Sequence, residues 1–254
     1  MGRPDSRSRH ARFWETHKGA GGRTRPDDAI DNDTSLADFI AGWGGINDVE
    51  WVTVTYAVIG LTNFGERPGP SARLAEVLGP SVSEAEALAK QWSWPGTRVE
   101  DGLISVDAER AKSATRRHVQ VGDRRFGVTG CAPDILQYAP LVRPSLHLED
   151  TCAATGTPIL IVFTPSRVER VDPSSTVLVM PHPRELVPAE ADGAVEEVDA
   201  NLCVQMPLFS SAAAAAGWLA DHPGGRVFPI REAWDLSLFR DWRDRISALL
   251  NLDD

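Results

Sequence analysis

The segment HVQVGDRRFGV, residues 118–128, carries the clearest local folding signal in the sequence. His118–Val121 and Arg125–Val128 are strand-like, and Gly122-Asp123 between them is a two-residue connection typical of a β-hairpin. The hairpin lies near the middle of the chain, between a helical part and a part rich in strands.

Two short helices are predicted upstream of the hairpin. Ser71–Leu78 and Ser83–Trp92 have apolar residues at helical spacing, and Gly79-Pro80 turns the chain between them. Ser83 and Glu86 have the spacing of a capping box. Helices followed by a hairpin predict a winged-helix-like N-terminal domain over residues 49–128.

Strands separated by turns dominate residues 129–254, which predicts a second domain with a mixed or antiparallel sheet and flanking helices. The fold class is therefore α+β. We expect helices at 134–141, at 211–219 and at the end of the chain. The expected strands are 159–163, 168–171, 177–180, 202–206 and 226–230.

The first 48 residues differ from the rest in charge. Residues 1–25 have seven Arg or Lys, and residues 26–50 have seven Asp or Glu with no Lys or Arg. We expect residues 1–48 to be a mostly disordered tail. No stretch approaches the roughly 20 apolar residues of a membrane span, and no secretory signal is visible, so we expect a cytoplasmic protein without a membrane partner.

Three cysteines in 254 residues do not fit a disulfide-stabilised secreted protein. Cys131 precedes Pro133, a residue suited to a first helical turn, so a helix N-terminus would favour its thiolate. Asp134 lies about one helical turn further on and can face the same cleft. Cys152 has no charged partner in its local sequence, and Cys203 lies near the start of a strand after the acidic loop 190–199. Taken singly, each cysteine is better explained by packing than by chemistry.

The combination of motifs changes this balance. Cys131-Ala-Pro-Asp134, then Cys152-Ala-Ala-Thr-Gly156, then Leu202-Cys203-Val204 before Leu208-Phe209-Ser-Ser resembles the organomercurial (alkylmercury) lyase family over about residues 71–250. The resemblance implies that Cys131 and Cys203 bind mercury and are catalytic, that Asp134 is the catalytic aspartate, and that Cys152 is structural. It also implies that the winged-helix-like part does not bind DNA and that residues 129–254 form the catalytic domain.

Coordination chemistry agrees with those implied roles, because mercury is a soft cation and thiolates are soft ligands. Two thiolates on mercury make its bound carbon more carbanion-like, and Asp134 can take a thiol proton and later give it to that carbon. We expect no resident cofactor. Hg(II) would stay bound as product until external thiols remove it, with hand-off to a mercuric reductase or to cellular thiols. The implied process is detoxification, as part of mercury resistance.

The sequence departs from the family pattern at Gly130, Val128 and Leu202, where aromatic side chains are expected. These smaller residues would reshape the substrate pocket. Residues 1–70 match the family poorly and receive no role.

Two alternatives stay open. One is a diverged family member that uses the same thiol pair on another metabolite. The other is a metal-responsive winged-helix regulator, but a net charge of −10 and a single cation, Lys90, within residues 83–92 argue against a nucleic-acid partner.

Overall fold

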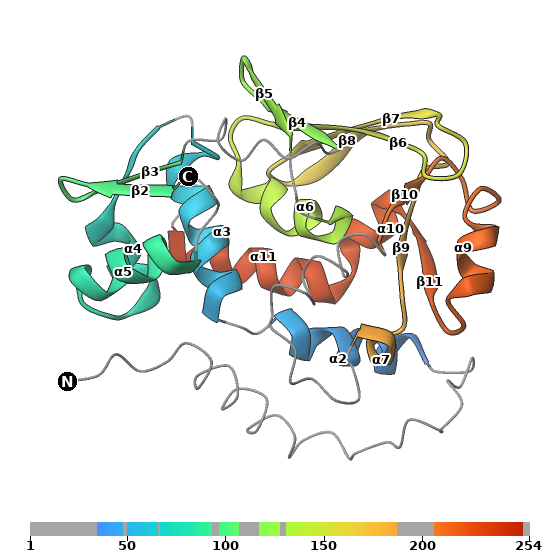
Figure 1. Cartoon of the computed structure of the whole chain (residues 1–254), viewed down its shortest axis with the longest axis horizontal. Helices are drawn as coiled ribbons and strands as arrows, with labels where there is room; N and C mark the ends of the chain where they lie inside the picture. Colours follow the sequence, from blue (N-terminus) through green and yellow to red (C-terminus); the bar gives the residue numbers. More distant parts are fainter. Residues whose placement is uncertain are drawn as a thin grey trace. The chain divides into compact units, whose positions relative to one another are not determined.

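A five-stranded antiparallel sheet organises the middle of the chain (Figure 1). The computed structural model describes residues 35–47, 50–65, 67–92, 97–106, 117–127, 131–186 and 206–250. The strands follow the order β5-β4-β6-β7-β8, and every neighbouring pair is antiparallel. Their bounds are Arg124–Gly127 for β5, His118–Val121 for β4, Leu146–Thr151 for β6, Pro158–Thr164 for β7 and Arg167–Asp172 for β8.

One face of this sheet is buried because every second residue of β6 and β7 is buried. Leu148 lies opposite Ile161, and Leu146 lies opposite Phe163. Helix α6 (Ala132–Tyr138) and the 3-10 turn η1 (Ala139–Leu141) lie beneath the sheet, and α11 (Ser237–Leu250) lies beyond α6 (Figure 1). The start of α6 is therefore held in the interior between sheet and helix.

The predicted hairpin is confirmed as β4 and β5, with the turn at Gly122-Asp123. It does not form a separate wing, however, because β4 also pairs with β6 and so joins the five-stranded sheet. The described residues all fall within one unit that runs from Asn32 to Asp254. A domain boundary at residue 128 stays a prediction.

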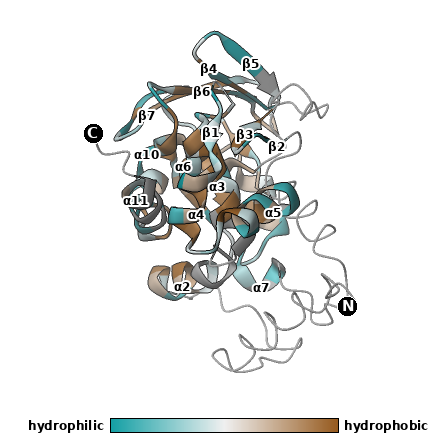
Figure 2. Cartoon of the chain, turned by 90° about the vertical axis from the view of Figure 1, so that its left-hand side faces the viewer, coloured by the Kyte–Doolittle hydropathy of each residue, from teal (hydrophilic) through white to brown (hydrophobic). Residues whose placement is uncertain are grey.

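Helices α3 (Glu50–Thr62), α4 (Ser71–Leu78) and α5 (Val82–Trp92) lie together at one end of this unit. A three-stranded sheet of order β1-β3-β2 accompanies them, formed by Gly69–Pro70, Leu103–Val106 and Thr97–Glu100 respectively. Figure 2 shows apolar residues gathered around α3 and α6, and hydrophilic residues on the outer sides of α5 and β5. The core is thus continuous from α3 to the five-stranded sheet.

The two predicted helices are confirmed as α4 and α5, but the predicted capping box is wrong by two residues. The Ser81 hydroxyl and backbone N–H both donate to Glu84 Oε2, at 2.6 and 3.0 Å, and the Glu84 N–H donates back to the Ser81 hydroxyl. Helix α5 begins at Val82, so Ser81 and not Ser83 occupies the cap position.

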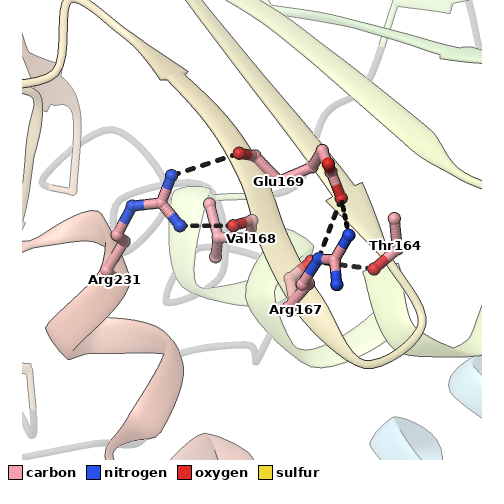
Figure 3. Close-up of polar contacts among 5 residues, drawn as sticks. All are labelled: Thr164, Arg167, Val168, Glu169 and Arg231. Carbon is pink, nitrogen blue, oxygen red and sulfur yellow. Dashed lines mark hydrogen bonds and ion pairs between the residues drawn. The ribbon is translucent and has the colours of Figure 1, made fainter.

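A third sheet of order β10-β9-β11 is built from Leu208–Phe209, Val177–Met180 and Arg226–Pro229. Its strands β9 and β11 confirm two predicted strands, while residues 202–205 of another lie outside the described residues. Helix α9 (Ala216–Asp221) begins later than expected, after a turn at 212–215. Helix α10 (Ile230–Asp235) is attached to β8, because Arg231 donates to the backbone carbonyls of Val168 and Glu169 (Figure 3).

The expectation of a tail over residues 1–48 is corrected for its last part. Leu36–Asn47 forms helix α2, in which Phe39 and Trp43 are buried. The Trp43 indole N–H donates to the carbonyl of Pro181 at 3.2 Å, just before α7 (Pro183–Leu186). Residues 1–34 lie outside the described residues.

Helices and antiparallel sheets alternate along the described chain, which confirms the mixed helix and antiparallel-sheet class. Among the helices of the described ranges, none combines the length and the apolar character required to span a bilayer.

Candidate active site

The first turn of α6 holds Cys131 and Asp134 together. Cys131 is the N-cap residue, with extended backbone angles, and Asp134 is the third residue of the helix. Asp134 Oδ2 accepts hydrogen bonds from the Cys131 backbone N–H at 2.8 Å and from its thiol at 3.0 Å. The predicted proximity of the two side chains is therefore confirmed, and it follows from helix-cap geometry.

The second oxygen of Asp134 is also occupied. The Tyr56 hydroxyl, from α3, donates to Asp134 Oδ1 at 3.0 Å across a sequence separation of 78 residues. Burial, and then the negative charges of Asp134 and Cys131, raise the pKa of Tyr56 well above its ordinary value. Tyr56 therefore stays protonated and remains a donor.

Tyr56 was not among the site residues predicted from the sequence. It lies in an apolar run where an aromatic residue indicates packing, and its partner is distant in sequence. The described fold brings the two together because α3 packs against α6 and η1.

The wall behind this pair is aromatic. Tyr138, one turn after Asp134 on α6, is fully buried, and its ring lies 6.0 Å from that of Tyr56 and 5.3 Å from that of Phe64. Burial and the charge of Asp134 raise the pKa of Tyr138, and the positive charge of Arg117 opposes them.

A buried ion pair supplies that positive charge. Arg117 Nε lies 2.9 Å from Asp150 Oδ2, and both residues are buried. Asp150 Oδ1 also accepts from the Thr151 N–H at 2.7 Å. Pairing and hydrogen bonding offset the desolvation of these two charges.

Cys152 is buried, at 2% exposure, in the turn between β6 and β7. Its backbone N–H donates to Thr157 O at 2.8 Å. Burial raises the pKa of its thiol, but hydrogen bonds from Ser210 and Thr155 outweigh burial and lower it to about 6. The thiol thus has donors that its neighbouring sequence did not reveal, one of them near β10.

Cys203 lies outside the described residues, as do Gly130, Val128 and Leu202. Its pairing with Cys131 stays a prediction, and so does the effect of the three smaller residues on the pocket. The described chain resumes at Met206, which is buried, and β10 follows.

Two histidines of the described chain have partners away from Cys131 and Asp134. His222 pairs with Glu185 at 2.8 Å and stacks on Trp218, while His182 contacts the ring of Phe39. Within the described ranges, no three His, Cys, Asp or Glu side chains converge in a way that could hold a metal ion.

Residues 111–242, about half of the chain, match the alkylmercury lyase family model. The chain belongs to the alkylmercury lyase family. Membership places it among the carbon–mercury lyases, as the sequence motifs predicted.

Individual relatives agree with this membership. The chain is 27% identical to an alkylmercury lyase of Streptomyces lividans over 171 residues, which cover 67% of this chain and 74% of the relative. It is 26% identical to the alkylmercury lyase of Bacillus cereus over 163 residues, or 64% and 69% of the two chains. A solved structure described as the mercury-bound form of MerB2 aligns with a TM-score of 0.48 and 18% identity, over 83% of this chain and 100% of that chain.

Proposed function

We propose that the protein cleaves carbon–mercury bonds by protonolysis, with Cys131 and Cys203 as mercury ligands and Asp134 as the proton carrier. The observation that supports this most is the 3.0 Å hydrogen bond from the Cys131 thiol to Asp134 Oδ2. A carboxylate at that distance is within reach of the thiol proton.

The reaction starts when Asp134 accepts the Cys131 proton and the thiolate binds the mercury of R–Hg–X, displacing X⁻. Cys203 then adds to the same mercury as a thiolate, its proton leaving with X⁻ as HX, and pushes electron density toward carbon. The Hg–C bond breaks as its electron pair takes the proton from Asp134. The products are the hydrocarbon R–H and Hg(II) held by two thiolates.

Release of Hg(II) requires ligand exchange with other thiols. We therefore propose that turnover uses external thiols, with hand-off to cellular thiols or a mercuric reductase, and needs no resident cofactor. A cytoplasmic setting, where free thiols are abundant, suits this chemistry.

We propose that the N-terminal helices have a structural role. The order α3, β1, α4, α5, β2, β3, with β1 paired to β3, supports a winged-helix-like arrangement in which β2 and β3 replace the hairpin first expected. Helix α5 has Lys90 as its one cation beside Glu84 and Glu86. This charge is unsuited to phosphate contacts, so we propose no nucleic-acid partner and no membrane partner.

Benzene release from phenylmercury in excess thiol tests the proposed function. We expect turnover by the wild-type protein and near-complete loss in Cys131→Ser and Cys203→Ser. Asp123→Asn, which changes an exposed turn residue, is the control and should keep wild-type turnover. Full activity of Cys131→Ser would contradict the proposal.

A further inference from the structure

Asp134 is held from two directions by two different parts of the chain. Oδ2 accepts from the Cys131 backbone and thiol, which belong to its own helix cap, while Oδ1 accepts from Tyr56 on α3. A carboxylate held at both oxygens cannot rotate about its terminal bond without losing a hydrogen bond. The two oxygens are therefore not equivalent.

Helix α3 is fixed relative to α6 at a second point. At the end of α3, Asn63 Nδ2 donates to the carbonyl of Arg143 at 2.7 Å, and Asn63 Oδ1 accepts from the Arg143 N–H at 2.6 Å. Arg143 follows η1, so these bonds attach the far end of the α6–η1 segment to α3. Together with the Tyr56–Asp134 bond, they hold the two segments in register.

We propose that Tyr56 is a positioning residue that directs Asp134 so that Oδ2, and not Oδ1, exchanges the proton with Cys131 and the reacting carbon. This inference rests on the proposed function. It also extends the active site to α3, which lies outside residues 111–242, the part that matches the family model.

The protonation state of the Tyr56 hydroxyl suits it to position Asp134. Burial and the nearby negative charges raise the pKa of Tyr56, so its hydroxyl keeps its proton while Cys131 and Asp134 exchange theirs. Among the described residues, Tyr138 also raises the pKa of Tyr56, and Arg117, which is paired with Asp150, lowers the pKa of Tyr138. Tyr56 is thus a donor to Oδ1 throughout the reaction.

The first test compares Tyr56→Phe with Tyr138→Phe in phenylmercury turnover. Each variant removes one buried hydroxyl and keeps the ring, and these are the two tyrosines of the chain. We expect Tyr56→Phe to lower kcat about 10-fold with KM changed less than about 2-fold, because proton transfer and not binding is affected. Tyr138→Phe, which keeps the Tyr56–Asp134 hydrogen bond, should lower kcat less than Tyr56→Phe does. Equal kcat values for Tyr56→Phe and wild type would overturn the proposal.

The second test does not depend on mercury. The rate of Cys131 alkylation by iodoacetamide is measured against pH, with the label localised by fragment-ion mass spectrometry. Without the Tyr56 donor, the Cys131–Asp134 pair carries negative charge less readily, so the midpoint of the alkylation profile should move to higher pH in Tyr56→Phe. The Tyr138→Phe profile should stay near that of wild type.

The two tests separate the two claims. Failure of the wild-type protein to release benzene would reject the proposed function, while a shifted alkylation profile would still support the Tyr56–Asp134–Cys131 arrangement. Benzene release by wild type together with unchanged kcat and unchanged alkylation in folded Tyr56→Phe would reject the role of Tyr56 alone.

Discussion

At the scale of single residues, Asp134 connects the Cys131 thiol to the fold. It completes the N-terminal cap of α6 through the Cys131 N–H and reaches the thiol with the same oxygen. An aspartate at this helix position is ordinary as a cap. The contact of its carboxylate with a thiol and with a buried phenol is what suits it to proton transfer.

Asp134→Asn should therefore separate chemistry from capping. The amide keeps the shape and an acceptor oxygen but cannot carry the proton. We expect phenylmercury turnover to fall by about 10²- to 10⁴-fold. The midpoint of thermal unfolding should change by no more than about 4 °C, the shift that roughly 1 kcal/mol produces in a folded unit of about 150–250 residues. Turnover within about 3-fold of wild type would contradict a proton-carrying role.

Cys152 should make stability depend on pH. Its pKa in the folded protein is about 6, below the ordinary 9.0, so its contribution is complete above pH 9 and is lost as pH falls through 6. We expect the free energy of unfolding of wild type to drop by on the order of 2–4 kcal/mol more than that of Cys152→Ser over this range.

Urea unfolding at several pH values measures this difference. Ser210→Ala, which removes one of the donors to the Cys152 thiol, should show an intermediate dependence on pH. Parallel pH profiles for wild type and Cys152→Ser would show that the thiol is not ionised in the folded protein.

At the scale of elements, helix caps and turns follow local rules. Ser81 and Glu84 cap α5 reciprocally, and hydrogen bonds from Ser81 lower the pKa of Glu84. Ser81→Ala should lower the free energy of unfolding by about 1 kcal/mol, and Ser83→Ala, in the first turn of the same helix, by less than about 0.5 kcal/mol. Chemical denaturation of the two variants measures the difference. A larger loss in Ser83→Ala would favour the cap that the sequence spacing first suggested.

The elements that could be predicted are those whose signal is local. Gly122-Asp123 specified the β4–β5 turn, and the apolar run 177–180 specified β9. Strand β6 was not predicted, because it carries charged residues among its apolar ones. Its Asp150 points to the buried side and is stabilised there by Arg117, 33 residues away.

The candidate site likewise contains residues whose contact a local signal predicted and residues whose contact it did not. Cys131 and Asp134 are three residues apart, so helix geometry predicted their contact. Tyr56 reaches Asp134 only through the packing of α3 against α6, and no periodicity in the sequence encodes that pairing. Family resemblance supplied Cys203, which local physics left as a packed thiol.

At the scale of the whole molecule, helix α2 packs into the folded unit, although composition predicted that its residues belong to a disordered tail. Phe39 is 1% exposed, its ring contacts His182 and Phe228, and the guanidinium of Arg226 lies 5.4 Å from its centroid. Phe39→Ala should lower the free energy of unfolding by about 3–5 kcal/mol.

Leu36→Ala provides the control, since Leu36 lies on the same helix and is 45% exposed. It should cost less than about 1 kcal/mol. Urea unfolding measures both variants. If both lose a similar, small amount of unfolding free energy, residues 36–47 do not pack into the folded unit, as the composition predicted.

The proposed reaction requires two thiols that bind one mercury and a proton that removes its carbon. Mercury L-edge X-ray absorption of the full-length protein, after reaction with one equivalent of phenylmercury and without external thiol, tests this most directly. We predict mercury bound by two sulfur atoms with no carbon neighbour in wild type, and a retained mercury–carbon bond in Asp134→Asn. A retained mercury–carbon bond in wild type, with a single sulfur ligand, would contradict the account.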